Sequence, residues 1–199
     1  MASVSQNPIT TATAAEAEQL LRDAGALLEG HFQLASGKHS SLYIEKFRLL
    51  ERPPQTEALC RMIAGWALAL SPQLVAGPTT GGIIISYEVA RILGTRSIFA
   101  ERNEDGSPGR GFQRGFQISP GERVLVVDDV LTTGGSIRDV LDAVRKLGGE
   151  VAGVAVLVDR AGSSVDFGVP FFACLALDLP VFAPDDCPLC RDKIPLKVT

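Results

Sequence analysis

The hydrophobic and polar positions in the first third of the chain predict two helices separated by a pair of short strands. Residues 14–28 carry apolar side chains on one helical face, and Thr13 with Glu16 forms a capping-box pattern at the start. Residues 30–50 contain two short apolar stretches around a Ser-Gly turn, which is typical of two strands. A second apolar stripe over residues 56–70 follows two prolines and predicts another helix.

The hydrophobic pattern changes near residue 73, where short continuous apolar runs begin to alternate with helical patterns. Strands are expected over residues 73–77, 96–101, 123–127, 151–158 and 171–179. Helices are expected over residues 83–93 and 136–147, and the polar, Gly-rich residues 103–111 predict an exposed mobile loop. Strands that alternate with helices of this length predict βαβ crossovers and a mostly parallel sheet covered on both faces.

The predicted fold class is therefore α/β, with a mostly parallel sheet flanked by helices and a small N-terminal cap, or hood. We expect a single domain over residues 1–199, made of hood elements in residues 1–50, an α/β core in residues 51–180 and a Cys-containing tail in residues 181–199.

Composition and charge exclude several classes of function. The 199 residues are 46% hydrophobic and 21% charged, as in a globular domain, and the formal net charge of −4 gives no general attraction to nucleic acid or anionic membranes. No apolar run approaches the ~20 residues of a membrane span, and the first residues lack a signal-peptide pattern. We expect a cytoplasmic protein with no nucleic-acid or membrane partner.

The stretch VLVVDDVLTTGGS, residues 124–136, combines an acid pair with a loop suited to an anion. Asp128 and Asp129 follow a buried strand, and a loop of small and hydroxyl residues then leads into a helix. The N–H groups at a helix start bind phosphate, whereas carboxylates accept hydrogen bonds from a diol or hold Mg²⁺ through water. A ribose 5-phosphate satisfies both demands, with its phosphate in the loop and its hydroxyls on the acids. The phosphate loop consists of Thr132, Thr133, Gly134, Gly135 and Ser136.

This stretch resembles the phosphoribosyl pyrophosphate (PRPP) binding motif of type I phosphoribosyltransferases. The resemblance implies that the loop holds the 5-phosphate and that the acids face the ribose, where one of them stabilises positive charge on the sugar. The segment GPTTGG, residues 77–82, resembles the pyrophosphate loop of the same family, which assigns pyrophosphate to Thr79, Thr80, Gly81 and Gly82. Arg102 matches the arginine that contacts pyrophosphate in the family.

The hood segment HFQLASGKHSSLYIEKF, residues 31–47, resembles that of orotate phosphoribosyltransferases. The resemblance implies that Tyr43 stacks on the pyrimidine, that Arg160 in VLVDRAG binds the orotate carboxylate through its guanidinium fork, and that Thr132 reaches both phosphate loop and base. Lys38 matches a basic position that approaches pyrophosphate. The structural alternatives are a surface ion pair for Arg160, a core aromatic for Tyr43 and a solvated Lys38.

The mobile loop departs from the family pattern. Residues 101–115 contain no lysine or histidine, and Ala35 stands where many orotate enzymes have a lysine. Arg110 and Arg114 are the remaining cations that can neutralise a leaving pyrophosphate. The predicted activity is transfer of the phosphoribosyl group from PRPP to orotate with Mg²⁺, by a homodimer. A phosphoribosyltransferase for uracil or a purine, or a PRPP-sensing regulator without turnover, remain alternatives.

The tail contains a Cys-x-x-Cys pair, Cys187 and Cys190. Zinc takes four protein ligands at a structural site, so this pair supplies half of a site. His31 and His39 lie far away in the sequence, and a second pair from a symmetry partner is another source of ligands. Two alternatives involve no metal: the two cysteines are reduced and pack against the rest of the domain, or they form a reversible disulfide. The tail resembles that of a subset of bacterial orotate phosphoribosyltransferase-like sequences.

Overall fold

A computed structural model describes residues 13–34, 36–161 and 165–199. Its helices are α1 (Ala14–Asp23), α2 (Lys46–Leu50), α3 (Pro53–Ala67), α4 (Gly81–Leu93), α5 (Gly135–Lys146) and α6 (Pro188–Arg191), with 3₁₀ turns at Leu68–Leu70 and Pro184–Asp186. Its strands are β1 (Leu27–Gln33), β2 (His39–Ile44), β3 (Leu74–Pro78), β4 (Arg96–Arg102), β5 (Arg110–Gly111), β6 (Arg123–Leu131), β7 (Glu150–Asp159), β8 (Phe171–Ala176), β9 (Val181–Phe182) and β10 (Lys197–Val198).

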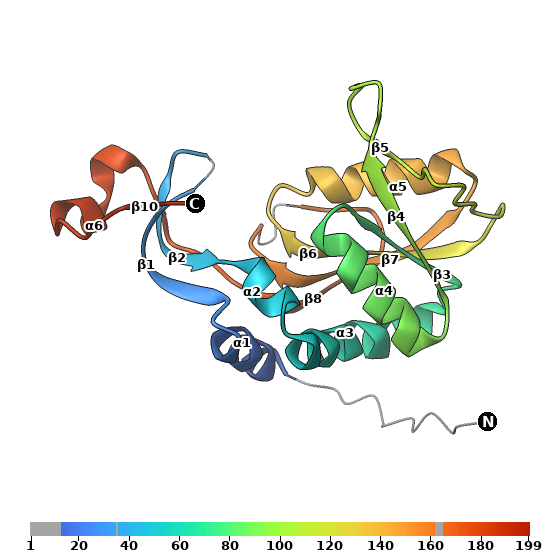
Figure 1. Ribbon diagram of the computed structural model, residues 1–199, viewed down its shortest axis with the longest axis horizontal. Helices are drawn as coiled ribbons and strands as arrows, with labels where there is room; N and C mark the ends of the chain where they lie inside the picture. The colour runs from blue at the N-terminus through green and yellow to red at the C-terminus, as the bar shows by residue number, and fades with distance from the viewer. Residues whose placement is uncertain (1–12, 35, 162–164) are drawn as a thin grey trace.

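The core is a six-stranded sheet in the order β5-β4-β3-β6-β7-β8. All of its neighbouring strands are parallel except β4 and β5, which form an antiparallel edge. Helix α5 covers one face, and α3 and α4 cover the other (Figure 1). The α/β fold predicted from the sequence is confirmed.

Two continuous apolar clusters hold these layers together. The first packs α1, α3 and α4 on the sheet around fully buried Leu59, Ile63 and Ile85, and the second packs α5 on the opposite face around Ile137 and Val140. The central strands β3, β6 and β7 contribute side chains to both clusters, which explains why their sequences are continuous apolar runs.

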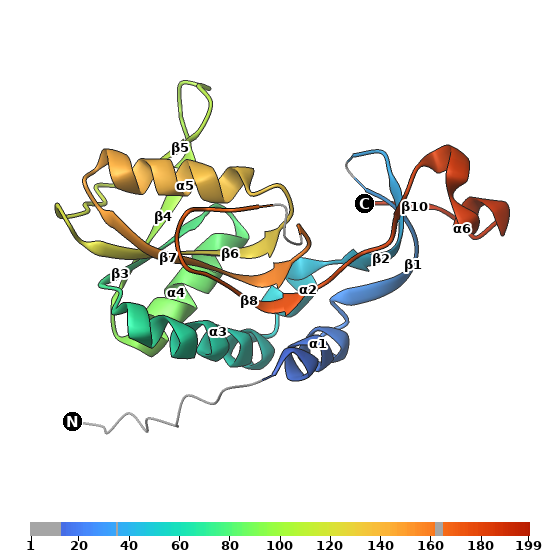
Figure 2. The same ribbon diagram turned by 180° about the vertical axis from the view of Figure 1, so that it is seen from behind.

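A second, four-stranded sheet forms the hood, in the order β10-β1-β2-β9. The hairpin β1–β2 is its centre, and the tail contributes a short strand to each edge. Figures 1 and 2 show this sheet and α6 at one end of the molecule, with the tail lying beside the hairpin. The first and last parts of the chain therefore build one small unit.

Several element boundaries differ from the sequence expectation: residues 46–50, expected in the two-strand segment, form α2, and the strand expected over residues 171–179 ends at Ala176. The helix expected over residues 14–28 ends at Asp23, because Gly25 adopts a left-handed φ of 65° and the chain enters β1 at Leu27. The strand expected over residues 123–127 continues to Leu131, because its pairing with β7 runs on to Leu131 opposite Asp159. The loop expected over residues 103–111 ends in β5, whose Arg110 pairs with Arg102.

None of the helices in the described part of the chain is both long and apolar enough to cross a membrane.

Candidate active site

The site lies where β3 and β6 end side by side at the centre of the sheet. Strand β3 pairs with β4 on one side and β6 on the other, so α4 and α5 leave these two strands toward opposite faces of the sheet. Such a switch point opens a crevice beyond the carboxyl ends of parallel strands. The sequence of the chain therefore brings the two predicted anion loops, residues 79–82 and 132–136, to one crevice.

Two helices, α4 and α5, begin at this crevice. The N-cap residues are Thr80 for α4 and Gly134 for α5, and neither cap has a side-chain hydrogen bond from the described residues. Gly134 has a left-handed φ of 77°, and a Cβ there would press on Val165 and Phe167. Two uncapped helix starts supply two sites for anions.

The loop before α5 forms a small polar cup with a volume of about 50 Å³. Its lining is Asp128, Val130, Leu131, Thr132, Thr133, Gly134, Gly135, Ser136 and Ile137. Thr132, Thr133 and Ser136 are exposed in it and offer hydroxyl donors beside the backbone N–H groups. The structure thus brings the predicted 5-phosphate residues together.

Asp128 and Asp129 are both buried at the crevice end of β6. The Asp128 Oδ1 atom accepts a hydrogen bond of 2.8 Å from the Asp129 N–H, and the Asp129 Oδ1 atom accepts one of 2.7 Å from Val130. Lys46 places its Nζ atom 2.8 Å from the Asp129 Oδ2 atom. This ion pair partly compensates the burial of two adjacent negative charges.

Lys46 is a functional candidate that sequence reasoning missed. It begins α2, more than eighty positions before the acids, and although it lies within the hood segment of residues 31–47, the resemblance gives it no role. Its only sequence signal is its place directly after the strand that carries Tyr43.

Burial and the neighbouring Asp129 charge raise the pKa of Asp128 to about 7. Lys46 and Arg110 act in the opposite direction, together with the backbone hydrogen bond from Asp129. Desolvation is the largest cause of the raised Asp128 pKa, because the buried carboxylate lacks water to stabilise its charge. A ligand that brings a cation or hydroxyl groups to this position replaces that water and favours the ionised form.

The two loops approach each other so closely that only glycine fits between them. A Cβ at Gly81 would collide with the Asp129 carboxylate, its Cγ atom lying 2.9 Å away. A Cβ at Gly77 would collide with the carbonyl of Gly82. Glycine in GPTTGG therefore allows the loop of residues 77–82 to pack closely on the acid pair.

Arg110 is buried between the two loops, with only 7% of its side chain exposed. Its Nη1 atom donates to Thr79 Oγ1 at 2.8 Å and to the Ala100 carbonyl at 3.4 Å, and its Nε atom lies 4.0 Å from Asp139 Oδ2. A cation held against Thr79 is suited to neutralise a polyanion bound at the loop of residues 79–82.

The other two arginines of this region lie in different settings. Arg102 is exposed at the end of β4 and lines a cavity of about 470 Å³ together with Arg110, Thr133 and Ser136. Arg114 forms a bidentate ion pair with Glu101, with two N–O distances of 2.9 Å, and does not line this cavity. Arg110 and Arg102 thus face the crevice, and Arg114 is engaged elsewhere.

Arg160 follows β7 and is half-buried without an ionic partner among the described residues. Its backbone N–H donates to Leu131 at 2.8 Å, and its buried Nε atom has no hydrogen-bond acceptor in the described part of the chain. Burial lowers the pKa of Arg160, and Tyr43 is close enough to act on it in the opposite direction. An unpaired guanidinium in such a place is suited to an external carboxylate.

The hood contains two further predicted site residues, Tyr43 and Lys38. Tyr43 is half-buried and stacks on Phe32, with ring centroids 5.5 Å apart, so its ring belongs partly to the hood packing. Lys38 is exposed in the turn before β2. Ala35 lies outside the described residues. Cys187 and Cys190 lie in the tail against the hood hairpin, away from the crevice.

The donor set at the crevice fits Mg²⁺ bound chiefly by a ligand. Asp128 and Asp129 offer carboxylate oxygens, but Lys46 already contacts one of them. Mg²⁺ usually keeps several waters and binds through one or two carboxylates together with substrate phosphates.

Comparisons with known proteins identify relatives over most of the chain. The phosphoribosyl transferase domain model matches residues 49–175. The chain is 51% identical to an orotate phosphoribosyltransferase of Pelotomaculum thermopropionicum, over 88% of this chain and 91% of that protein. It is 48% identical to one of Thermotoga maritima, over 89% of this chain and 94% of that protein. The crystal structure of orotate phosphoribosyltransferase from Aeropyrum pernix superposes with a TM-score of 0.68 at 32% identity, covering 80% of this chain and 92% of that one.

Proposed function

The chain belongs to the orotate phosphoribosyltransferases of the phosphoribosyl transferase domain family, and we propose that the crevice binds PRPP between its two loops while Arg160 receives the base. The activity is transfer of the phosphoribosyl group to orotate, which gives orotidine 5′-monophosphate and pyrophosphate in pyrimidine biosynthesis. The family and activity predicted from the sequence are confirmed.

One observation carries the proposal for PRPP: a buried acid pair lies between two uncapped helix starts. PRPP has a phosphate at one end, a pyrophosphate at the other and a diol between them. The α5 start takes the 5-phosphate, the α4 start takes the pyrophosphate, and Asp128 and Asp129 accept hydrogen bonds from the ribose hydroxyls.

The charges of the site complement the transition state of the transfer. The ring nitrogen of orotate releases its proton to solvent and forms a bond to the anomeric carbon, the bond from that carbon to the pyrophosphate oxygen breaks, and its electron pair leaves with pyrophosphate. The acids lie beside the sugar as it gains positive charge, and Arg110 and Arg102 lie beside the departing polyanion. Most of the catalysis is then positioning and charge stabilisation.

Mg²⁺, when bound, neutralises part of the pyrophosphate charge and orients the ribose hydroxyls, and Asp128 and Asp129 are the residues that would hold it, through water. Arg110 lies against Thr79 as a fixed positive charge at the pyrophosphate end. The buried position of Arg110 supports its assignment to this role ahead of Arg114.

Base recognition rests on Arg160 and Tyr43. A carboxylate of orotate that reaches Arg160 gives that guanidinium the acceptor it lacks among the described residues. Tyr43 lies close to it, and Thr132, which lines the phosphate cup, directly follows Leu131, whose carbonyl accepts the Arg160 N–H. Lys38 remains a candidate for pyrophosphate from its place in the hood turn.

We also propose a homodimer through the face formed by α3 and α4, with the end of α2. An apolar groove of about 480 Å³ lies there, lined by Leu50, Pro53, Thr56, Ile83, Ile84 and Tyr87 among others. Tyr87 is 65% exposed, and α4 begins at the pyrophosphate loop, so this face is continuous with the site. Light scattering should give the dimer mass for the wild type and the monomer mass for Tyr87→Glu. The cytoplasmic location and the absence of nucleic-acid partners stay predictions from the sequence.

A base panel tests the proposed substrate. Purified protein with PRPP and Mg²⁺ is incubated with orotate, uracil, adenine and hypoxanthine, and nucleotide products are separated by chromatography. Orotidine 5′-monophosphate alone is expected. A product from another base, with none from orotate, would select the alternative phosphoribosyltransferase; PRPP binding without any product would select the regulator.

A further inference from the structure

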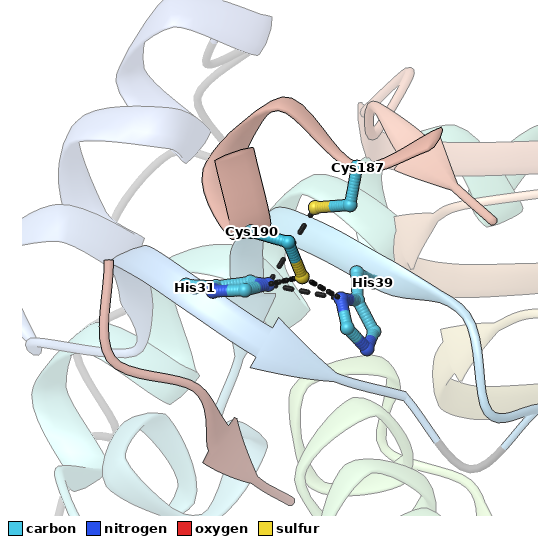
Figure 3. Close-up of side chains that lie close together, drawn as sticks. All are labelled: His31, His39, Cys187 and Cys190. Carbon is cyan, nitrogen blue, oxygen red and sulfur yellow. Dashed lines mark hydrogen bonds between the residues drawn. The ribbon is translucent and has the colours of Figure 1, made fainter. Parts of the chain in front are cut away.

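Four side chains from separate parts of the chain meet beside the hood: His31 in β1, His39 at the start of β2, and Cys187 and Cys190 at the start of α6 (Figure 3). One nitrogen or sulfur of each lies within 4.8 Å of those of the others. Figures 1 and 2 show α6 on the outer side of the hood sheet, away from the core sheet, so phosphoribosyl transfer at the ends of β3 and β6 does not account for the cluster. We propose that it is a structural Zn²⁺ site that fixes the tail to the hood.

The distances within the cluster match a tetrahedral ion. The His31 Nε2 atom is 2.9 Å from His39 Nδ1 and 3.5 Å from Cys187 Sγ, and Cys190 Sγ is 3.7 Å from His31 Nε2 and 3.3 Å from His39 Nδ1. Tetrahedral zinc with Zn–N bonds of about 2.0 Å and Zn–S bonds of about 2.3 Å separates its ligand atoms by roughly 3.3 to 3.8 Å. These four separations need shifts of a few tenths of an ångström to match the tetrahedral values, and the widest separation in the cluster, up to 4.8 Å, shortens by up to about 1 Å on binding.

The tautomer of His31 is set for metal binding. Its Nδ1 atom lies 2.8 Å from the carbonyl oxygen of Ile194, so Nδ1–H donates there and the Nε2 lone pair points into the cluster. A backbone acceptor that orients a ligating histidine in this way is typical of zinc sites.

Burial and charge also favour an ion. His31, His39 and Cys187 are only 2%, 5% and 1% exposed. Two thiols that lose their protons to solvent on binding become two thiolates, which neutralise Zn²⁺. A neutral centre with every ligand satisfied is far less costly to bury than separate polar groups. With four protein ligands the coordination sphere is closed, which indicates a structural role.

The tail buries few apolar side chains against the hood, so a metal ion would contribute strongly to holding the two together. Ile194, Leu196 and Val198 are all exposed, and β9 and β10 are two residues long each. His39 directly follows Lys38 and opens the strand that ends with Tyr43 and Ile44. The ion would therefore also fix the position of β2, the strand that carries Tyr43.

Metal analysis of the full chain, purified without an affinity tag, tests the site. We expect one equivalent of zinc per chain by mass spectrometry, and in cobalt-exchanged protein a thiolate-to-cobalt charge-transfer absorption. Cys187→Ser with Cys190→Ser, and separately His31→Ala, should reduce the bound zinc to background. Cys174→Ser is the matched control, because Cys174 is a buried thiol that donates to Leu59 far from the cluster; its zinc content should be unchanged.

Zinc removal from the wild type by a chelator provides a test that does not depend on the folding of a variant. Hydrogen exchange should accelerate in β1, β2 and the tail and stay unchanged in β6 and β7. The proposal is overturned if the wild type carries no zinc and binds no cobalt, if the double variant keeps its zinc, or if intact mass shows a Cys187–Cys190 disulfide in place of metal.

Discussion

The raised pKa of Asp128 predicts that PRPP binds more tightly as the pH rises through neutrality. With a pKa of about 7, roughly a tenth of the Asp128 carboxyl groups are ionised at about pH 6 and roughly nine tenths at about pH 8. If the ribose hydroxyls and Mg²⁺ require the carboxylate, the affinity for PRPP should rise about tenfold across this range.

Isothermal titration with PRPP and Mg²⁺ at several pH values measures this rise. Asp128→Asn is the matched control, because the amide keeps the size of the side chain and does not titrate. The phosphate groups of PRPP titrate equally with both proteins, so the contribution of Asp128 is the difference between the two pH profiles. Equal pH profiles for the two proteins would refute the reasoning.

The same shift has a consequence for stability with the opposite sign. The folded chain holds the Asp128 proton more tightly than the unfolded chain, so this group stabilises the fold below about pH 4 and loses that contribution as the pH rises to about 7. The free energy of unfolding of the wild type should fall relative to Asp128→Asn over this window, as measured by denaturant titration.

Three further predictions follow from the contacts of the site. Gly81→Ala should lower kcat/KM for PRPP by about 10² with the fold retained, because the new Cβ displaces the Asp129 carboxylate; wild-type kinetics would contradict this. Lys46→Met should move the pH midpoint of PRPP binding upward, since Lys46 lowers the Asp128 pKa, and an unchanged midpoint would exclude that role. Arg110→Gln should cost on the order of 10² in kcat, because it removes the cation held at Thr79, whereas the same change at Arg114 should leave single-turnover rates near the wild type.

The sequence predicts the core and the placement of the loops at residues 77–82 and 132–136 because their signals are local. The apolar run, the acids and the small-residue loop of residues 124–136 are contiguous, and so is GPTTGG. Strand alternation with helices then dictates the parallel sheet, and the switch point places both loops in one crevice.

What the sequence does not predict depends on contacts between distant segments. Lys46 reaches Asp129 only because α2 packs beside the crevice, and His31 and His39 reach the tail cysteines only because β9 and β10 flank the hood hairpin. Arg110 and Arg114 are equivalent in the sequence; the β4–β5 pairing turns the first inward and leaves the second beside Glu101.

The most direct test of the account is the orotate preference of Arg160→Gln. The wild type should use orotate far better than uracil, which lacks the carboxylate. The variant should lose about 10² or more in kcat/KM for orotate, with its Kd for PRPP unchanged, because only the bond to the carboxylate is removed. Undiminished use of orotate by the variant would contradict the assignment of the base to Arg160, and with it the proposed orientation of both substrates in the crevice.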